Sequence, residues 1–223
     1  MNVQITKSGL DGVPAAETVL SHVDGERGEL IIAGEHVGVL AAKSSFEGVT
    51  ARLWNGATLG TRSEANVRAS LGAARERAFA RLAELLPATR GLSIVDGFRA
   101  AVAGLRAENG LDHEATIVGA FPVIAGALVQ RAKGNDPVMP DPTASHAADT
   151  LSMMLGRKPD AREAAALDAY FVTVCDHGMN ASTFTTRVIA STHGLMRSRL
   201  PMASSISSTG SGAPPCSGPV SAQ

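Results

Sequence analysis

The chain has 223 residues and a mass of 22.9 kDa, with 44% hydrophobic but only 4% aromatic residues. Twenty basic and 21 acidic residues leave a net charge of −1, without the basic stripe of a nucleic-acid-binding protein. The residues Met1–Val13 lack the apolar core of a secretion signal, and the longest apolar run, Ile117–Val129, is too short to span a bilayer. We therefore expect a soluble, cytoplasmic protein that binds neither nucleic acid nor membrane.

The first 43 residues contain six glycines, too many for long helices. Asp24–Gly25 is a turn signal, and Glu29–Ala33 has the composition of a short strand. These patterns predict a small β element within Met1–Lys43, with a hairpin centred on Gly25–Gly28.

From Ser44 to His193 the apolar residues recur at helical spacing, which predicts a mainly α architecture with many helices of moderate length. Pro122 should break or bend the helix that contains it, because proline cannot donate a helical hydrogen bond. A loop is expected at Gly134–Pro142. The predicted helices are Phe46–Trp54, Glu64–Leu86, Ile94–Arg106, Leu111–Arg131, Ser145–Leu155 and Ala161–Cys175.

The helix predicted at Glu64–Leu86 has one apolar face and one charged face. Its apolar face consists of Val67, Leu71, Ala74, Ala78, Leu82 and Leu85. Its opposite face carries Arg68, Arg75, Glu76 and Arg77. Charged residues in this pattern usually face solvent, so we expect these four side chains to be hydrated.

Cysteines and most histidines give no sign of a metal site. Cys175 and Cys216 form no metal-binding pattern, which predicts free thiols in a reducing compartment. His177 and His193 are too far apart for an ordinary ligand pair. The remaining histidines are isolated in the sequence and predict no special role: His22, His36, His113 and His146.

The segment Leu167–Thr192 carries the clearest chemical pattern, a helix, a polar turn and a second helix. Gly178 can take the left-handed conformation that closes the first helix. Asn180 or Ser182 is the N-cap of the second. His177 in the turn could donate a hydrogen bond to a carbonyl or carboxylate oxygen. Asp176 either orients this imidazole or caps the turn.

This segment resembles the core of citrate synthases, whose pattern is close to DHE-x-NAST-F-T-x-R-V-x-AST. The chain matches it from Asp176 to Thr192, but has Gly178 where the family commonly has Glu and Val174 where many members have a second His. The N-terminal residues Gly9–Gly34 independently resemble the opening of the same family. There Ile32–Ala33 replaces the usual Tyr–Arg pair.

The resemblance implies a large helical domain of the citrate synthase type with a small N-terminal β element, incomplete at its C-terminal end. Family members join an acyl-CoA, usually acetyl-CoA, to oxaloacetate, and form dimers. The resemblance assigns His177, and more weakly Asn180, to the oxaloacetate site. It implies no bound cofactor and no metal, with acetyl-CoA as co-substrate. It does not separate citrate from 2-methylcitrate synthesis.

The final 30 residues, Gly194–Gln223, contain 16 Ser, Pro and Gly residues and no acidic residue. We expect a disordered tail there and a helical domain over residues 1–193. The family's catalytic His, His and Asp lie in later segments, which this chain lacks. We expect a frameshift or premature end near Thr192, with an evolved, shortened protein carrying a new tail as the alternative, and no synthase activity in the chain as written. For function, the alternative is a non-catalytic helical module that dimerises or binds carboxylates.

Overall fold

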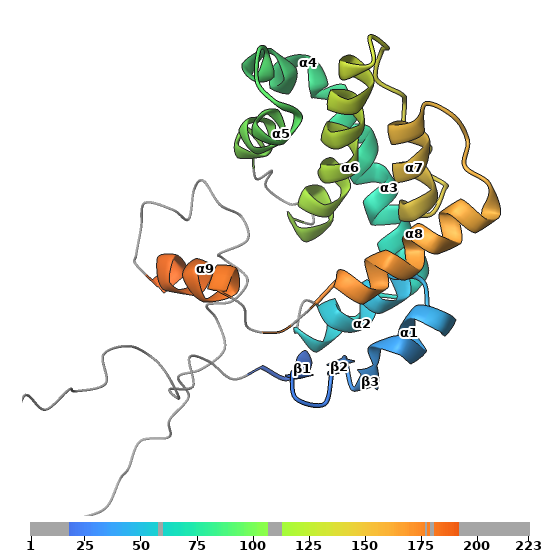
Figure 1. Cartoon of the computed structure of the whole chain (residues 1–223), viewed down its shortest axis with the longest axis vertical. Coiled ribbons are helices and arrows are strands. Elements are labelled where there is room, and N and C mark those ends of the chain that lie inside the picture. Colours follow the sequence, from blue (N-terminus) through green and yellow to red (C-terminus); the bar gives the residue numbers. More distant parts are fainter. Residues whose placement is uncertain (1–17, 58–59, 107–112, 177, 179–180, 192–223) are drawn as a thin grey trace, which may run out of the picture.

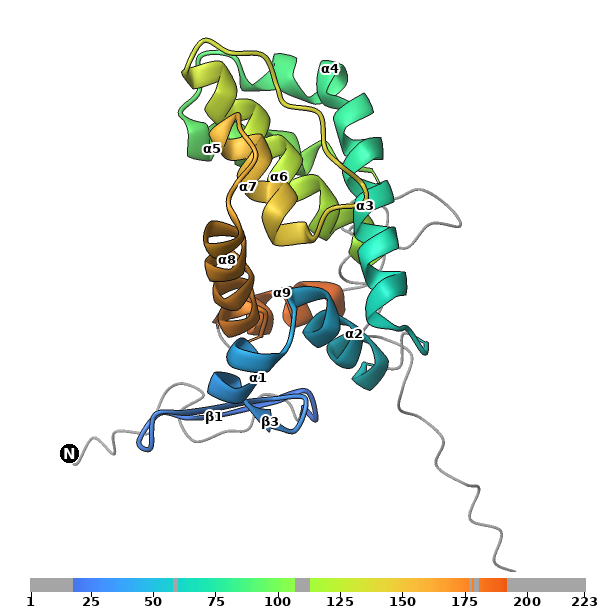
Figure 2. The same cartoon turned by 90° about the vertical axis from the view of Figure 1, so that its right-hand side faces the viewer.

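The computed structural model describes residues 18–57, 60–106, 113–176, 178 and 181–191. Within these ranges the protein is mainly α-helical with one small antiparallel sheet, which confirms the predicted fold class (Figure 1). The small sheet lies at one end of the molecule, and most of the long helices pack against one another at the other (Figure 2).

The predicted hairpin is present. β1 (Ser21–Asp24) pairs antiparallel with β2 (Glu29–Ile32), and Ser21 lies opposite Ile32 in the register. The Asp24 carboxylate closes the connecting turn by accepting backbone hydrogen bonds from Glu26 and Arg27. The two-residue strand β3 (Glu35–His36) completes the sheet.

Serine caps define the starts of two of the next three helices. The glycine-rich N-terminal part contains a short helix, α1 (Val37–Lys43), which was not predicted from the sequence. α2 (Phe46–Gly56) begins after Ser45, whose hydroxyl accepts a hydrogen bond from the Gly48 amide. α3 (Glu64–Ala80) begins with a reciprocal capping box between Ser63 and Asn66.

The helix predicted over residues 64–86 is not continuous. The Arg81 amide donates to the Ala78 carbonyl, a tight i−3 bond that ends α3. The chain then forms the single turn α4 (Leu82–Leu85) and the 3-10 turn η1 (Leu86–Thr89). The apolar spacing continues across this break, so periodicity alone did not reveal it.

The remaining helices are α5 (Ile94–Ala103), α6 (His113–Ala132), α7 (His146–Leu155), α8 (Ala161–Val174) and α9 (Ala181–Ser191). The helix was predicted to break or bend at Pro122, and α6 continues through it without a break. Pro122 is buried, and packing on both sides of it offsets one missing hydrogen bond. Among the described residues α6 alone is long and apolar enough to cross a membrane, but 56% of its most apolar window is buried.

The described part of the chain contains a large helical core, a smaller mixed one, and a third cluster of Ala51, Val67, Leu71 and Ala115. The large core joins α3 and α4 to α5, α6 and α7, and includes Leu82, Ile124 and Met153. The smaller core joins Ile32, Leu40, Val49 and Val172, from β2, α1, α2 and α8. α8 packs on both α7 and α1 and so connects the two regions (Figures 1 and 2).

α3 and α6 make the most extensive contact, and a glycine permits it. A Cβ at Gly119 would lie 2.6 Å from the Cβ of Ala74 and 3.1 Å from the Leu71 carbonyl oxygen. Only a residue without a side chain allows this approach of the two helices. Small residues therefore set the closeness of the central helix pair.

Candidate functional site

The link between α8 and α9 carries the residues that the sequence assigned to substrate. α8 ends at Val174, Gly178 has a φ of +75°, and α9 begins at Ala181. The left-handed glycine is confirmed, and Ser182 lies inside α9, so it is not the N-cap. The predicted substrate residues His177 and Asn180 lie outside the described residues.

Of the two roles considered for Asp176, the structure shows the cap of the turn. Its Oδ1 atom accepts a hydrogen bond of 2.7 Å from the Gly178 amide, which closes the turn. The same oxygen accepts a 2.7 Å hydrogen bond from the Ser21 hydroxyl on β1. Asp176 therefore both caps the turn and joins it to the sheet, a contact across 155 positions of sequence.

The thiol beside this link is unreactive in character. Cys175 is a free cysteine whose Sγ donates to the Val172 carbonyl at 3.1 Å. Burial, together with the neighbouring Asp176 carboxylate, raises the pKa of Cys175 to about 11. A thiol so rarely ionised at neutral pH is a poor nucleophile.

The largest departure from the sequence prediction is Arg75. It was expected on a solvated face, but its side chain is fully buried, whereas Glu76 is exposed. Helical spacing could have indicated this, since Arg75 is four residues after Leu71 and three before Ala78 on the buried face. The periodicity placed Arg75 in the core, but its charge led us to expect it in solvent.

Arg75 holds α7 and the loop before it against α3. Its Nε donates to Oδ2 of Asp149 at 2.5 Å, and its Nη2 donates to the carbonyls of Asp141 and Ala144 at 3.2 and 3.1 Å. The other Asp149 oxygen accepts the Asp141 amide at 2.9 Å. Burial raises the pKa of Asp149, an effect that Arg75 opposes.

His146 extends this network, although the sequence gave it no role. Its Nδ1 lies 3.2 Å from Nη1 of Arg75, and its ring stacks on Phe46 at a centroid distance of 5.2 Å. Burial first, and then the Arg75 charge, lower the pKa of His146 to about 3, so the ring is neutral and Nδ1 accepts. The His146 amide donates to Oε1 of the buried Glu47 at 2.9 Å.

We refer to Arg75, Asp149, His146 and Glu47 as the Arg75 cluster. Most of its bonds go to backbone groups and to its own members from α2, α3 and α7, and Nε of Arg68 on α3 lies 3.6 Å from Oε1 of Glu47. These contacts have the chemistry of a structural connection rather than of a reactive centre. Among the described residues no group of three His, Cys, Asp or Glu side chains could hold a metal ion.

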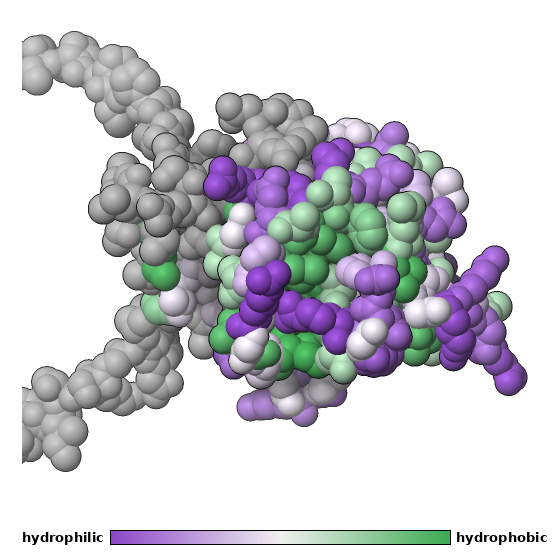
Figure 3. Space-filling view, turned by 90° about the horizontal axis from the view of Figure 1, so that it is seen from above, coloured by the Kyte–Doolittle hydropathy of each residue, from purple (hydrophilic) through white to green (hydrophobic). Residues whose placement is uncertain are grey.

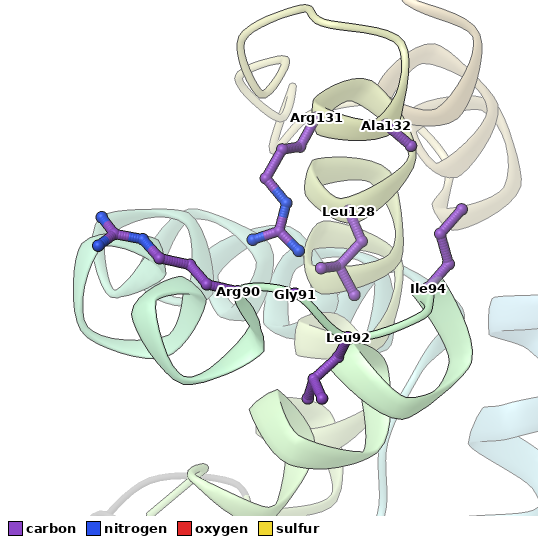
Figure 4. Close-up of a pocket in the computed structure, with 7 residues that line it drawn as sticks. All are labelled: Arg90, Gly91, Leu92, Ile94, Leu128, Arg131 and Ala132. Carbon is purple, nitrogen blue, oxygen red and sulfur yellow. The ribbon is translucent and has the colours of Figure 1, made fainter.

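The cavities in the described part of the chain hold no reactive constellation. One of about 290 Å³ lies between Leu128 of α6 and the residues before α5 (Figure 4). Arg131 points towards the Arg90–Gly91 segment and donates to the hydroxyl and carbonyl of Thr89, whereas Arg90 points away. A larger cavity, of about 520 Å³, lies between the loop before α7, α7 and the start of α8. A third, polar one borders α2 and measures about 620 Å³.

The fold belongs to the class of mainly α-helical domains. In this domain the short polar link between α8 and α9 is hydrogen-bonded to a small N-terminal sheet. Residues 9–209 match the family model described as citrate synthase, C-terminal domain. The chain belongs to the citrate synthase family.

Individual relatives agree with this assignment. A citrate synthase of Acidithiobacillus ferridurans is 34% identical over 82% of this chain and 52% of its own length. The citrate/2-methylcitrate synthase of Bacillus subtilis is 30% identical over 83% of this chain and 52% of its own. The chain therefore spans about half the length of the curated relatives it matches.

A solved structure has the same fold. The citrate synthase of Thermoplasma acidophilum, described as a ternary complex with carboxymethyl coenzyme A and oxaloacetate, superposes with a TM-score of 0.70 at 21% identity. The likeness covers 90% of this chain and 55% of that one.

Proposed function

We propose that this chain forms part of an acyltransferase that condenses acetyl-CoA, or a related acyl-CoA, with oxaloacetate to give citrate and CoA. The family match over residues 9–209 carries the proposal. The ligands named for the Thermoplasma acidophilum relative support oxaloacetate and an acyl-CoA as substrates. Relatives with both citrate and 2-methylcitrate in their names leave the length of the acyl group open.

Within this reaction His177 and Asn180 would bind oxaloacetate. An imidazole can donate to a ketone or carboxylate oxygen, and amide groups near a helix start attract carboxylates. The flanking residues Asp176 and Gly178 are joined to each other by a hydrogen bond. We assign no catalytic residue, resident cofactor or metal within the 223 residues; acetyl-CoA would act as co-substrate.

We further propose a soluble, cytoplasmic homodimer. Apolar side chains are exposed at α5 and α6, including Val95 at 59%, Ile94 at 46% and Phe121 at 38%. Apolar surface also gathers across the end of the molecule where α4 to α7 lie (Figure 3). Association through such a face would remove it from water. The domain would comprise residues 1–193, and residues 194–223 would form a tail outside it.

The test combines binding and turnover. We expect isothermal titration calorimetry of the 223-residue chain to show oxaloacetate binding that His177→Ala abolishes. His22→Ala, which removes an exposed histidine on β1, is the matched control and should leave binding unchanged. We expect no release of CoA thiol from acetyl-CoA and oxaloacetate by this chain alone. Thiol release would contradict the absence of catalytic residues, and equal binding by both variants would contradict the site.

A further inference from the structure

We propose that Ser21 of β1 and Asp176 are positioning residues that orient the link between α8 and α9 for oxaloacetate. The inference rests on the proposed function, because it concerns how position 177 is presented to that substrate. It adds to the family resemblance a residue from the N-terminal sheet, 155 positions away from the residue it bonds.

The first support is the shared oxygen. Oδ1 of Asp176 accepts from the Ser21 hydroxyl and from the Gly178 amide, both at 2.7 Å. Hydrogen bonds to a carboxylate are shorter and stronger than neutral ones. The acceptor lies before position 177 and the Gly178 donor lies after it, so both flanking residues share one carboxylate oxygen, which is itself bonded to Ser21 of β1.

The second support is packing beside that bond. A Cβ on Gly178 would lie 3.1 Å from Cγ2 of Val23 and 3.9 Å from the Ser21 hydroxyl oxygen. Ser21 and Val23 are two positions apart on one strand, so their side chains lie on the same face. That face of β1 therefore contacts the link at two points.

The sheet is a firm support for these contacts. Ser21 lies opposite Ile32 in the register, and Ile32 is fully buried in the smaller core. A functional residue is best positioned by contacts to a packed element. Loss of the Ser21 hydroxyl should leave the core intact while the link loses orientation.

The experiment uses two substitutions of similar shape in the 223-residue chain. Ser21→Thr keeps the hydroxyl, and Ser21→Val replaces it with a methyl group. We expect Ser21→Val to weaken oxaloacetate binding about fivefold, the value of one hydrogen bond, and Ser21→Thr to restore most of it. Ser93→Ala breaks a comparable bond of 2.8 Å to Asp96 on α5 and should leave binding unchanged.

Nuclear magnetic resonance of chain labelled with ¹⁵N-histidine separates positioning from stability. The His177 ring resonance, identified by its loss in His177→Gln, should move in Ser21→Val without oxaloacetate and return in Ser21→Thr. If both variants bind oxaloacetate equally and show the same His177 resonance, the inference is wrong and the proposed function stands. If the unsubstituted chain neither binds oxaloacetate nor shifts this resonance on its addition, the proposed function is wrong, and the inference falls with it.

Discussion

The Arg75 cluster and the link between α8 and α9 use hydrogen bonds to carboxylates in opposite ways. In the cluster, Arg75 and Asp149 are buried and bonded to each other and to backbone groups of the loop before α7. In the link, the half-buried Asp176 receives a side-chain hydrogen bond from Ser21. The cluster fixes how the helices pack, whereas the link is held by contacts that can be removed without opening the core.

This contrast separates stability from binding. A buried charge that loses its partner is costly, because the remaining charge is neither hydrated nor paired. A bond at a half-exposed position can be replaced by water at little cost. Substitutions in the cluster should therefore change the free energy of unfolding, and substitutions at the link should change binding.

The largest expected effect is that of Arg75→Leu. It leaves the Asp149 carboxylate buried without its cation and should lower the free energy of unfolding by about 3–5 kcal/mol, as measured by urea denaturation. Arg99→Leu removes an exposed arginine that, among the described residues, pairs only with the exposed Asp96 of its own helix, α5, and should cost less than about 1 kcal/mol. Equal costs for the two would remove the distinction between the buried cluster and ordinary surface charges.

The cluster should also make stability depend on pH through His146. Its pKa falls from 6.5 to about 3 on folding, so between these values the unfolded chain binds more protons. Stability should therefore fall as the pH drops below 6.5, by up to about 1.4 kcal/mol per pH unit from this group. Urea denaturation at several pH values should show a shallower slope for His146→Gln than for His22→Gln. The same slope in both would contradict a buried, neutral His146.

A smaller effect is expected where α3 and α6 meet. Gly119→Ala places a methyl group 2.6 Å from the Cβ of Ala74 and should cost about 1–3 kcal/mol by overpacking. Gly97→Ala in α5 is the matched control, since its nearest neighbours are side-chain atoms at 3.3 and 3.4 Å. Thermal unfolding should lower the melting temperature of the first variant more than that of the second.

The smallest effect on stability, but a specific one on binding, is expected at the link. Gly178→Ala puts a side chain at a φ of +75° and should cost about 1–2 kcal/mol. Gly91→Ala carries the same backbone strain at φ +75°, with open space around it and away from the link. Both should lose similar stability in urea, but only Gly178→Ala should weaken oxaloacetate binding in calorimetry. Equal oxaloacetate binding by the two variants would contradict a role of the link between α8 and α9 in the proposed site.

Local patterns predicted much of the fold. Glu29–Ile32 forms the expected strand, and α8 begins at Ala161 as predicted, with Asp160 as its N-cap. The differences arose where tertiary contacts override local preference. Pro122 does not interrupt α6, and the chain turns at Arg81 in spite of continuous apolar spacing. Residue type also gave a wrong expectation for Arg75, because an arginine on a helix is normally solvated.

The sequence by itself determined the family and the left-handed Gly178, because motif order and glycine's conformational freedom are local properties. Its assignment of His177 and Asn180 to substrate stays a prediction. Only the tertiary structure brought Ser21 to Asp176 and buried Arg75 against Asp149. Both pairs join residues far apart in the chain, and no local preference encodes which partner a polar group meets once the helices pack.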